Sequence, residues 1–427
     1  MKRYEELYDV LNKELQPALG CTEPAAVTYA CAVAAKALGV PAEKVEIAAS
    51  KNILKNVMGV GIPNTDSYGI TAAAAMGVQL TDIDKKLMIL NDATPDVCKK
   101  AGLMMRQNRI EVCEAKHSSR IHIEVICRGG GHESKVIVDG LHTNIVSVMR
   151  DGAELKVPGQ EKGSADESVK TDLRGYTIQD FCEFASVADA RRLASTRKAV
   201  ELSKKLSDEG LKGKYGLGVG KALKEMAVQG EHGLVNEVKY ITAAAADARM
   251  AGCELPMMSL CGSGNQCIEA TLPVAAAAVR SGASEEKMIC AAALSQLITV
   301  YTKQYTGRLS PICGCGLAAA IGAAAGITWM NHGTVPMVEA AIKNVAADLS
   351  GMICDGAKPG CSLKLATAAG TAVQSAMLAL KGISATDRDG IVEQSAEKTI
   401  QNLGILDKDG MNCTDQVILD LMLGQYA

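Results

Sequence analysis

Residues 352–361 read Met-Ile-Cys-Asp-Gly-Ala-Lys-Pro-Gly-Cys and interrupt two helical patterns, at 336–350 and 361–381, in the second half of the chain. The segment sets Cys354 and Cys361 seven positions apart around small residues, one Asp and one Lys. Glycine and proline mark turns and end helices. The pattern therefore predicts two helices joined by a loop that carries two thiols.

A second cysteine-bearing turn lies upstream, where residues 312–316 read Ile-Cys-Gly-Cys-Gly. Thiolates are soft ligands that favour iron–sulfur clusters or zinc, and glycines let the backbone wrap closely around an inorganic centre. These residues favour a [4Fe–4S] cluster held by Cys354, Cys361 and one of Cys313 and Cys315, which leaves one iron open for a substrate. Two alternatives stay open: a zinc site, although zinc cysteines are usually paired at shorter spacings, and ordinary buried cysteines.

The composition limits the classes of protein to which the chain can belong. It has 427 residues, 15 cysteines and a net charge of −3, which allows roughly two or three domains and gives no charge argument for a nucleic-acid partner. The odd number of cysteines and an N-terminus without an apolar signal region favour a reducing cytoplasm. We expect no membrane partner, because no apolar run matches a membrane span. The Ala-rich second half favours subunit contacts, and we expect a homodimer.

Hydrophobic periodicity predicts an α+β fold, in which N-terminal helices and an α/β domain precede a large all-α domain. We expect residues 1–40 to form helices that pack on the helical domain, residues 41–170 to form the α/β domain, and residues 171–427 to form the cluster-binding catalytic domain. The α/β domain is expected to contain a strand at 45–49, a hairpin of 121–127 with 134–138, helices at 71–80 and 95–108, and a polar linker at 151–170. Further helices are expected at 177–191, 195–207, 219–228, 234–250, 266–281, 286–305, 316–329, 336–350, 361–381 and 387–402.

Residues 20–24, Gly-Cys-Thr-Glu-Pro, stand at the start of a predicted helix, where proline is tolerated. The oriented N–H groups of a helix N-terminus lower the pKa of a thiol, so we expect Cys21 to be a thiolate near neutral pH. The same N–H groups, beside Thr22 and Glu23, would alternatively suit a substrate carboxylate. A third interpretation is an ordinary helix cap with an incidental cysteine.

A glycine-rich turn at 261–267, Cys-Gly-Ser-Gly-Asn-Gln-Cys, opens another predicted helix. Its small polar residues form a turn that suits anions. Ser263, Asn265 and Gln266 have the groups to hydrogen-bond an amino-acid ligand. The alternative is a capped helix start between packed helices.

Three weaker signals remain. Within residues 51–56, Lys55 and Asn56 suit a carboxylate or phosphate, although a solvated helix end would have the same composition. Residues 216–221, Gly-Leu-Gly-Val-Gly-Lys, are similar to a phosphate loop but lack the Walker spacing. His142 falls in a predicted hairpin turn, where we expect it to be exposed.

The chain resembles the L-cysteine desulfidase family and, more distantly, the iron–sulfur L-serine dehydratases. The segments that carry the resemblance are 20–26, 51–65, 262–266, 307–316 and 351–365, which run almost from end to end of the chain. The resemblance implies a [4Fe–4S] cluster without redox chemistry, held by three cysteines with one iron open.

Carried over residue by residue, the resemblance makes Cys354 and Cys361 the paired cluster ligands. The third ligand is Cys313, with Cys315 as the alternative. Cys21 matches the N-terminal cysteine and is the expected catalytic base. The expected substrate-binding residues are Thr22, Glu23, Lys55, Asn56, Ser263, Asn265 and Gln266.

The implied reaction is a β-elimination without pyridoxal phosphate, which converts L-cysteine and water to pyruvate, ammonia and hydrogen sulfide. The open iron would bind the leaving thiolate while Cys21 takes the α-proton, in an oxygen-sensitive carbon–sulfur lyase of amino-acid catabolism. Two alternatives stay open: an L-serine or threonine dehydratase with the same cluster, and a non-catalytic cysteine or sulfide sensor. The chain departs from the family pattern at Cys261 and Cys267, where smaller residues are expected.

Overall fold

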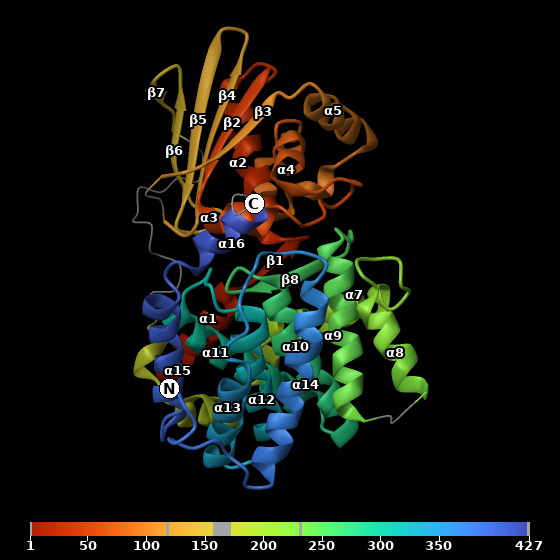
Figure 1. Ribbon diagram of the computed structural model, residues 1–427, viewed down its shortest axis with the longest axis vertical. Helices are drawn as coiled ribbons and strands as arrows, with labels where there is room; N and C mark the ends of the chain where they lie inside the picture. The colour runs from red at the N-terminus through yellow and green to blue at the C-terminus, as the bar shows by residue number, and fades with distance from the viewer. Residues whose placement is uncertain (1, 117–118, 157–171, 230–232, 425–427) are drawn as a thin grey trace.

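The computed structural model describes residues 2–116, 119–156, 172–229 and 233–424. Figure 1 shows two stacked halves, with a sheet and its helices at the top and a bundle of helices below. Each half has its own hydrophobic core. The predicted α+β fold with a large helical part is confirmed.

The secondary structure elements alternate in the first part of the chain and are mostly helical in the second. The first part comprises α1 (Lys2–Glu14), β1 (Leu15–Leu19), α2 (Thr22–Leu38), β2 (Lys44–Ala49), α3 (Lys51–Val57), α4 (Gly69–Gly77), η1 (Ile83–Asp92), α5 (Pro95–Arg106), β3 (Ile110–Glu114), β4 (His122–Gly129), β5 (His132–Asp139), β6 (Ile145–Arg150) and β7 (Ala153–Glu154). The second comprises η2 (Leu173–Gly175), α6 (Ile178–Val187), η3 (Ala190–Arg192), α7 (Ala194–Gly210), α8 (Val219–Gln229), α9 (Leu234–Met250), β8 (Pro256–Leu260), α10 (Gly264–Ser281), α11 (Glu285–Thr306), η4 (Gly314–Ala318), α12 (Ala319–Met330), α13 (Val335–Leu349), α14 (Cys361–Leu380), α15 (Ala396–Ile405), η5 (Leu406–Gly410) and α16 (Thr414–Met422).

The sheet of the upper half has six strands in the order β3-β2-β4-β5-β6-β7. Strands β2 and β3 are parallel, and the other neighbouring pairs are antiparallel. Side chains alternate between the two faces of a strand, and in β4 this places Ile123, Val125 and Cys127 in the core under α2. The predicted strand at 45–49 and the predicted hairpin are therefore present.

A second, two-stranded sheet is not predicted by the sequence. Strand β1 pairs antiparallel with β8, from Leu15 opposite Leu260 to Leu19 opposite Pro256. Pro17 interrupts β1 and obscures its pattern, because proline is uncommon inside strands. The pair ties the segment between α1 and α2 to the helical half.

The predicted segment 1–40 contributes to both cores. Leu7 and Leu11 of α1 are buried in the core of the helical half, whereas Ala30 and Val33 of α2 are buried under the sheet. Helices α1 and α2 therefore bridge the two halves.

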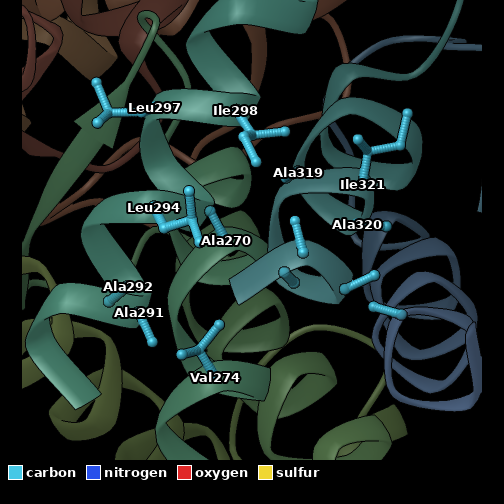
Figure 2. Close-up of a cluster of buried hydrophobic side chains, with 14 of the residues drawn as sticks. Ala270, Val274, Ala291, Ala292, Leu294, Leu297, Ile298, Ala319, Ala320 and Ile321 are labelled. Carbon is cyan, nitrogen blue, oxygen red and sulfur yellow. The ribbon is translucent and has the colours of Figure 1, made fainter. Parts of the chain in front are cut away.

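Small side chains let the helices of the lower half pack closely. Figure 2 shows Ala270 and Val274 of α10, Leu294 and Ile298 of α11, and Ile321 of α12 in one buried cluster. Helix α14 is long and apolar enough, by length and composition, to cross a membrane, but it packs against α9, α12 and α13. In this structure α14 is a core helix of the bundle.

The described elements differ from the predicted ones at a few places. The helix predicted at 387–402 is α15, which begins at Ala396. Strands β3 and β6 and helix α16 are additional. Most of the linker predicted at 151–170 lies outside the described residues.

Close packing of α11 and α12 gives a first prediction. A Cβ atom at Gly322 would meet the carbonyl oxygen of Ser295 and the hydroxyl of Thr299. Gly322→Ala should lower the free energy of unfolding, because overpacking costs about 1–3 kcal/mol whereas the gain in helix propensity is at most about 1 kcal/mol. Chemical denaturation measures the change. Gly175→Ala, where nothing lies within 4 Å of the added atom, should change it by less than about 0.5 kcal/mol; equal effects would contradict the prediction.

Candidate active site

Two backbone hydrogen bonds hold the cysteine-bearing loops side by side. The N–H of Cys313 donates to the carbonyl of Met352 (2.8 Å), and the N–H of Cys354 donates to the carbonyl of Pro311 (2.6 Å). Ile312 and Ile353 thereby form an antiparallel bridge. The two loops that the sequence singles out are therefore one structural unit at the starts of η4 and α14.

The loop from Cys354 to Cys361 is held by charge and by close packing. Asp355 forms ion pairs with Lys358 and Lys364. Burial acts to raise the pKa of Asp355, but the hydrogen bonds and charges of the two lysines outweigh it and lower that pKa to about 2. Gly356 has φ of +89°, and a side chain there would collide with the carbonyl of Lys55, so this position requires glycine.

Lys55 is 1% exposed and forms two contacts. Its Nζ donates to the carbonyl oxygen of Cys354 (2.8 Å) and forms an ion pair with Asp415 of α16. Asn52 also donates to Asp415, at 2.6 Å. Lys55 therefore lies at the site, as expected, and its contacts fix the cysteine loop and the C-terminal helix.

Cys21 stands at the start of α2, as predicted, with its thiol inside a polar cluster. Its Sγ donates to Oε2 of Glu23 (3.0 Å), and Asn56 donates to Oε1 of the same carboxylate (3.2 Å). Burial, followed by the charge of Glu23, raises the pKa of Cys21 far above its ordinary value, while the charge of Arg249 acts in the opposite direction. The expectation of a thiolate at neutral pH is therefore wrong for the free site.

In the turn at 261–267, two of the predicted substrate-binding side chains form hydrogen bonds within the turn itself. The hydroxyl of Ser263 accepts from the N–H of Gln266 (3.4 Å), and the side chain of Gln266 donates to the carbonyl of Leu260 (3.1 Å). Both shape the turn. The hydroxyl of Thr22 donates to the carbonyl of Gly262, so Thr22 joins α2 to this turn. Cys261, which stands where a smaller residue is expected, has φ of +50°, a conformation that glycine adopts more readily.

A cavity of about 70 Å³ lies where these segments meet. Of the predicted site residues, Thr22 alone is missing from its wall, and that residue is fully buried. The predicted residues in the wall are Cys21, Glu23, Lys55, Asn56, Ser263, Asn265, Gln266, Cys313, Cys315, Cys354 and Cys361. Residues separated by more than 300 positions in the sequence thus surround one small space.

Four of these wall residues are the thiols that could hold a cluster. The N–H of Gly316 donates to Sγ of Cys313 (3.3 Å), and hydrogen bonds of this kind tune cluster ligands. Among the described residues, no three His, Cys, Asp or Glu side chains are grouped as ligands of a single metal ion. Thiolates are the usual protein ligands of a [4Fe–4S] cluster, so the donor set of Cys313 or Cys315, with Cys354 and Cys361, suits such a cluster by its chemistry.

Most of the positively charged residues in the cavity wall are not predicted from the sequence. Lys364, Lys303, Arg308 and Arg249 lie there without being predicted. Their sequence context gives no signal, because each lies in a helical or loop pattern typical of a solvated charge. Two of these four are paired with carboxylates inside the protein, Lys364 with Asp355 and Arg308 with Glu14, as is the predicted Lys55 with Asp415.

His142 is also buried, contrary to the expectation of an exposed turn. Its Nε2 lies 3.9 Å from Oε1 of Glu23 and has no hydrogen-bond partner among the described residues. Burial lowers the pKa of His142; the charge of Glu23 acts to raise it and that of Arg308 to lower it. A neutral imidazole therefore stands behind the Glu23 carboxylate.

The loop that is similar to a phosphate site binds a carboxylate of the chain itself. Oδ2 of Asp247 in α9 accepts from the N–H of Gly220 (2.9 Å) at the start of α8. The N–H of Gly220, within residues 216–221, is thus used inside the protein.

Comparisons with known proteins show the family that the chain resembles. A family model described as serine dehydratase alpha chain matches residues 84–420. The chain is 39% identical over 423 residues to a UPF0597 protein of Clostridium tetani, covering 99% of both chains. It is 39% identical to a UPF0597 protein of Bacteroides thetaiotaomicron (98% and 97% covered) and 40% identical to one of Clostridium perfringens (98% of each).

The buried imidazole gives a prediction about pH. Because the pKa of folded His142 lies below that of the unfolded chain, the unfolded state binds the proton more readily. The free energy of unfolding should therefore fall as pH decreases below about 6.5, with a slope of up to about 1.4 kcal/mol per pH unit. In His142→Gln this part of the slope should disappear. Denaturation curves between pH 5 and 8 measure it, with the exposed His332→Gln as control; an unchanged slope in His142→Gln would refute the assignment.

Proposed function

Because the chain belongs to the family of serine dehydratase alpha chains, we propose that its cavity converts L-cysteine to pyruvate, ammonia and hydrogen sulfide with the help of a [4Fe–4S] cluster. The family relationship makes the chain a lyase-type enzyme of amino-acid catabolism, related to iron–sulfur dehydratases. The cluster at these thiols and the choice of cysteine are the parts that we propose.

The observation that carries the proposal is the convergence of four thiols on one cavity that also contains Cys21. We assign Cys313, Cys354 and Cys361 as ligands. Cys313 is preferred because the backbone bridge fixes it beside Cys354, whereas Sγ of Cys315 contacts the hydroxyl of Ser263 at 3.5 Å. When bound, a cluster with one iron free of protein ligands supplies a Lewis acid that stabilises the leaving group.

The proton of the substrate Cα is assigned to the pair of Cys21 and Glu23. Glu23 accepts the thiol proton across their 3.0 Å hydrogen bond, which leaves sulfur free to take the α-proton. The electron pair of the C–H bond becomes the double bond, and the electron pair of the C–S bond leaves with sulfur as hydrosulfide. The aminoacrylate then hydrolyses to pyruvate and ammonia without further help.

L-Serine is the second candidate substrate, in view of the family description. Cysteine is favoured because a departing thiolate is a soft ligand and suits iron better than a hydroxide. A sensor without turnover would bind cysteine and release neither product. The two substrates and the sensor are therefore separated by the products alone.

Anaerobic purification with iron and sulfide analysis, followed by product assays, tests the proposal. We expect about four irons per chain, and both sulfide and pyruvate from L-cysteine. Cys354→Ser should lose the iron and the activity together, whereas Cys113→Ser, on the exposed face of β3, should keep both. Pyruvate from L-serine alone would make the chain a dehydratase, and an iron-free wild-type chain would overturn the cluster.

The role of Cys21 gives a separate prediction. Cys21→Ala should keep its iron but lose turnover by roughly 100- to 10,000-fold, because general-base catalysis is removed. Cys413→Ala, at an exposed position before α16, should be unaffected. Steady-state kinetics on iron-matched proteins measures the effect. Turnover of Cys21→Ala within a few-fold of wild type would show that another group takes the α-proton.

A further inference from the structure

Arg249 is a buried cation with an unsatisfied guanidinium. It is 3% exposed, lies at the end of α9 and lines the cavity. Its Nε has no hydrogen-bond partner among the described residues. A guanidinium remains charged at any physiological pH, and burying it unpaired is strongly unfavourable. The free site therefore holds a positive charge that is ready for an anion.

The fold makes room for this guanidinium. A Cβ atom at residue 264 would collide with Nε of Arg249 and with Sδ of Met257, so the second glycine of the Gly-Ser-Gly turn leaves the space that Arg249 fills. The nearby Glu23 carboxylate already accepts from Cys21 and Asn56. An internal counter-ion for Arg249 is absent from the described part of the chain.

Two unsatisfied acceptors complete the pattern. Oδ1 of Asn56 and Oδ1 of Asn265 are buried without a donor among the described residues, and both side chains line the same cavity. Buried polar atoms of this kind are normally satisfied. A positively charged hydrogen-bond donor would satisfy the two oxygens, and an anion would satisfy Arg249. An α-amino acid carries both groups, an ammonium and a carboxylate.

We propose that Arg249 binds the α-carboxylate of the substrate, while the side-chain oxygens of Asn56 and Asn265 accept from its α-ammonium group. Guanidinium and carboxylate are matched for a two-point contact. Arg249 is then the residue that selects α-amino acids over neutral amines. The inference rests on the proposed function for the identity of the ligand and adds the residue that recognises it.

A different role for Arg249 must be separated from this one. Its charge also acts to lower the pKa of Cys21, and that effect requires no carboxylate on the ligand. A probe that differs from the substrate only in its carboxylate distinguishes the two roles. L-Alanine has no leaving group, and L-alaninamide has the same shape without the negative charge.

Calorimetric titration of the anaerobically purified protein at pH 7 with these two probes is the test. Wild type should bind L-alanine at least about 30-fold more tightly than L-alaninamide, because losing one partner of a buried charged pair is costly. Arg249→Gln should weaken L-alanine to the level of the amide and leave the amide unchanged. Arg249→Lys should keep part of the preference, and the exposed Arg280→Gln should keep all of it.

Equal affinity of wild type for the two probes, or an undiminished preference in Arg249→Gln, would overturn the inference. If Arg249→Gln does not fold, the wild-type comparison and Arg249→Lys decide the matter: full preference in Arg249→Lys, with its altered geometry, would also count against a two-point contact. Carboxylate preference that depends on Arg249 in a protein that forms no product from cysteine or serine would uphold the inference and refute the proposed reaction.

Discussion

The backbone bridge between Ile312 and Ile353 is the constraint on which the site depends. Each cysteine loop is followed directly by a helix, η4 with α12 after the first and α14 after the second. Because the bridge joins the loops, it also fixes the starts of these helices against each other. Ordering two free loops around an inorganic centre would cost conformational entropy for every residue held. The packing of the Ala-rich bundle orders these loops when the protein folds, so binding of a ligand does not have to order them.

The second constraint is that the site belongs to neither half alone. The helical half supplies the four cysteines, and the sheet half supplies Cys21, Glu23 and Asn56. Lys55 of α3 forms an ion pair with Asp415 of α16, which packs on α3, and also donates to the carbonyl of Cys354 in the helical half. Removing one partner of a buried pair leaves an uncompensated charge. The C-terminal helix thereby helps to hold the sheet half against the cysteine loop.

Much of the fold could be predicted from the sequence, because long helical patterns and the alternating hairpin are local signals. Strands β1 and β8 could not, since five-residue strands, one with a central proline, carry no clear period. At the site, motifs with glycine beside cysteine or amide side chains predict most of the cavity wall. Arg249 and His142 lie in no such motif. Each is a single polar residue whose role comes from a non-local contact, with Gly264 and Glu23 respectively.

For Cys21, the sequence predicts the position at a helix start correctly but the charge of the thiol wrongly. A helix N-terminus stabilises a nearby anion by about 0.3–1 kcal/mol, which corresponds to less than one pKa unit at about 1.4 kcal/mol per unit. Full burial can shift a pKa by roughly 3–5 units in the opposite direction, and the Glu23 carboxylate at 3.0 Å adds to that effect. Burial therefore outweighs the helix N-terminus, and the resting thiol keeps its proton. The same carboxylate that disfavours the thiolate is then the nearest group that can accept its proton, and the two residues have to act together.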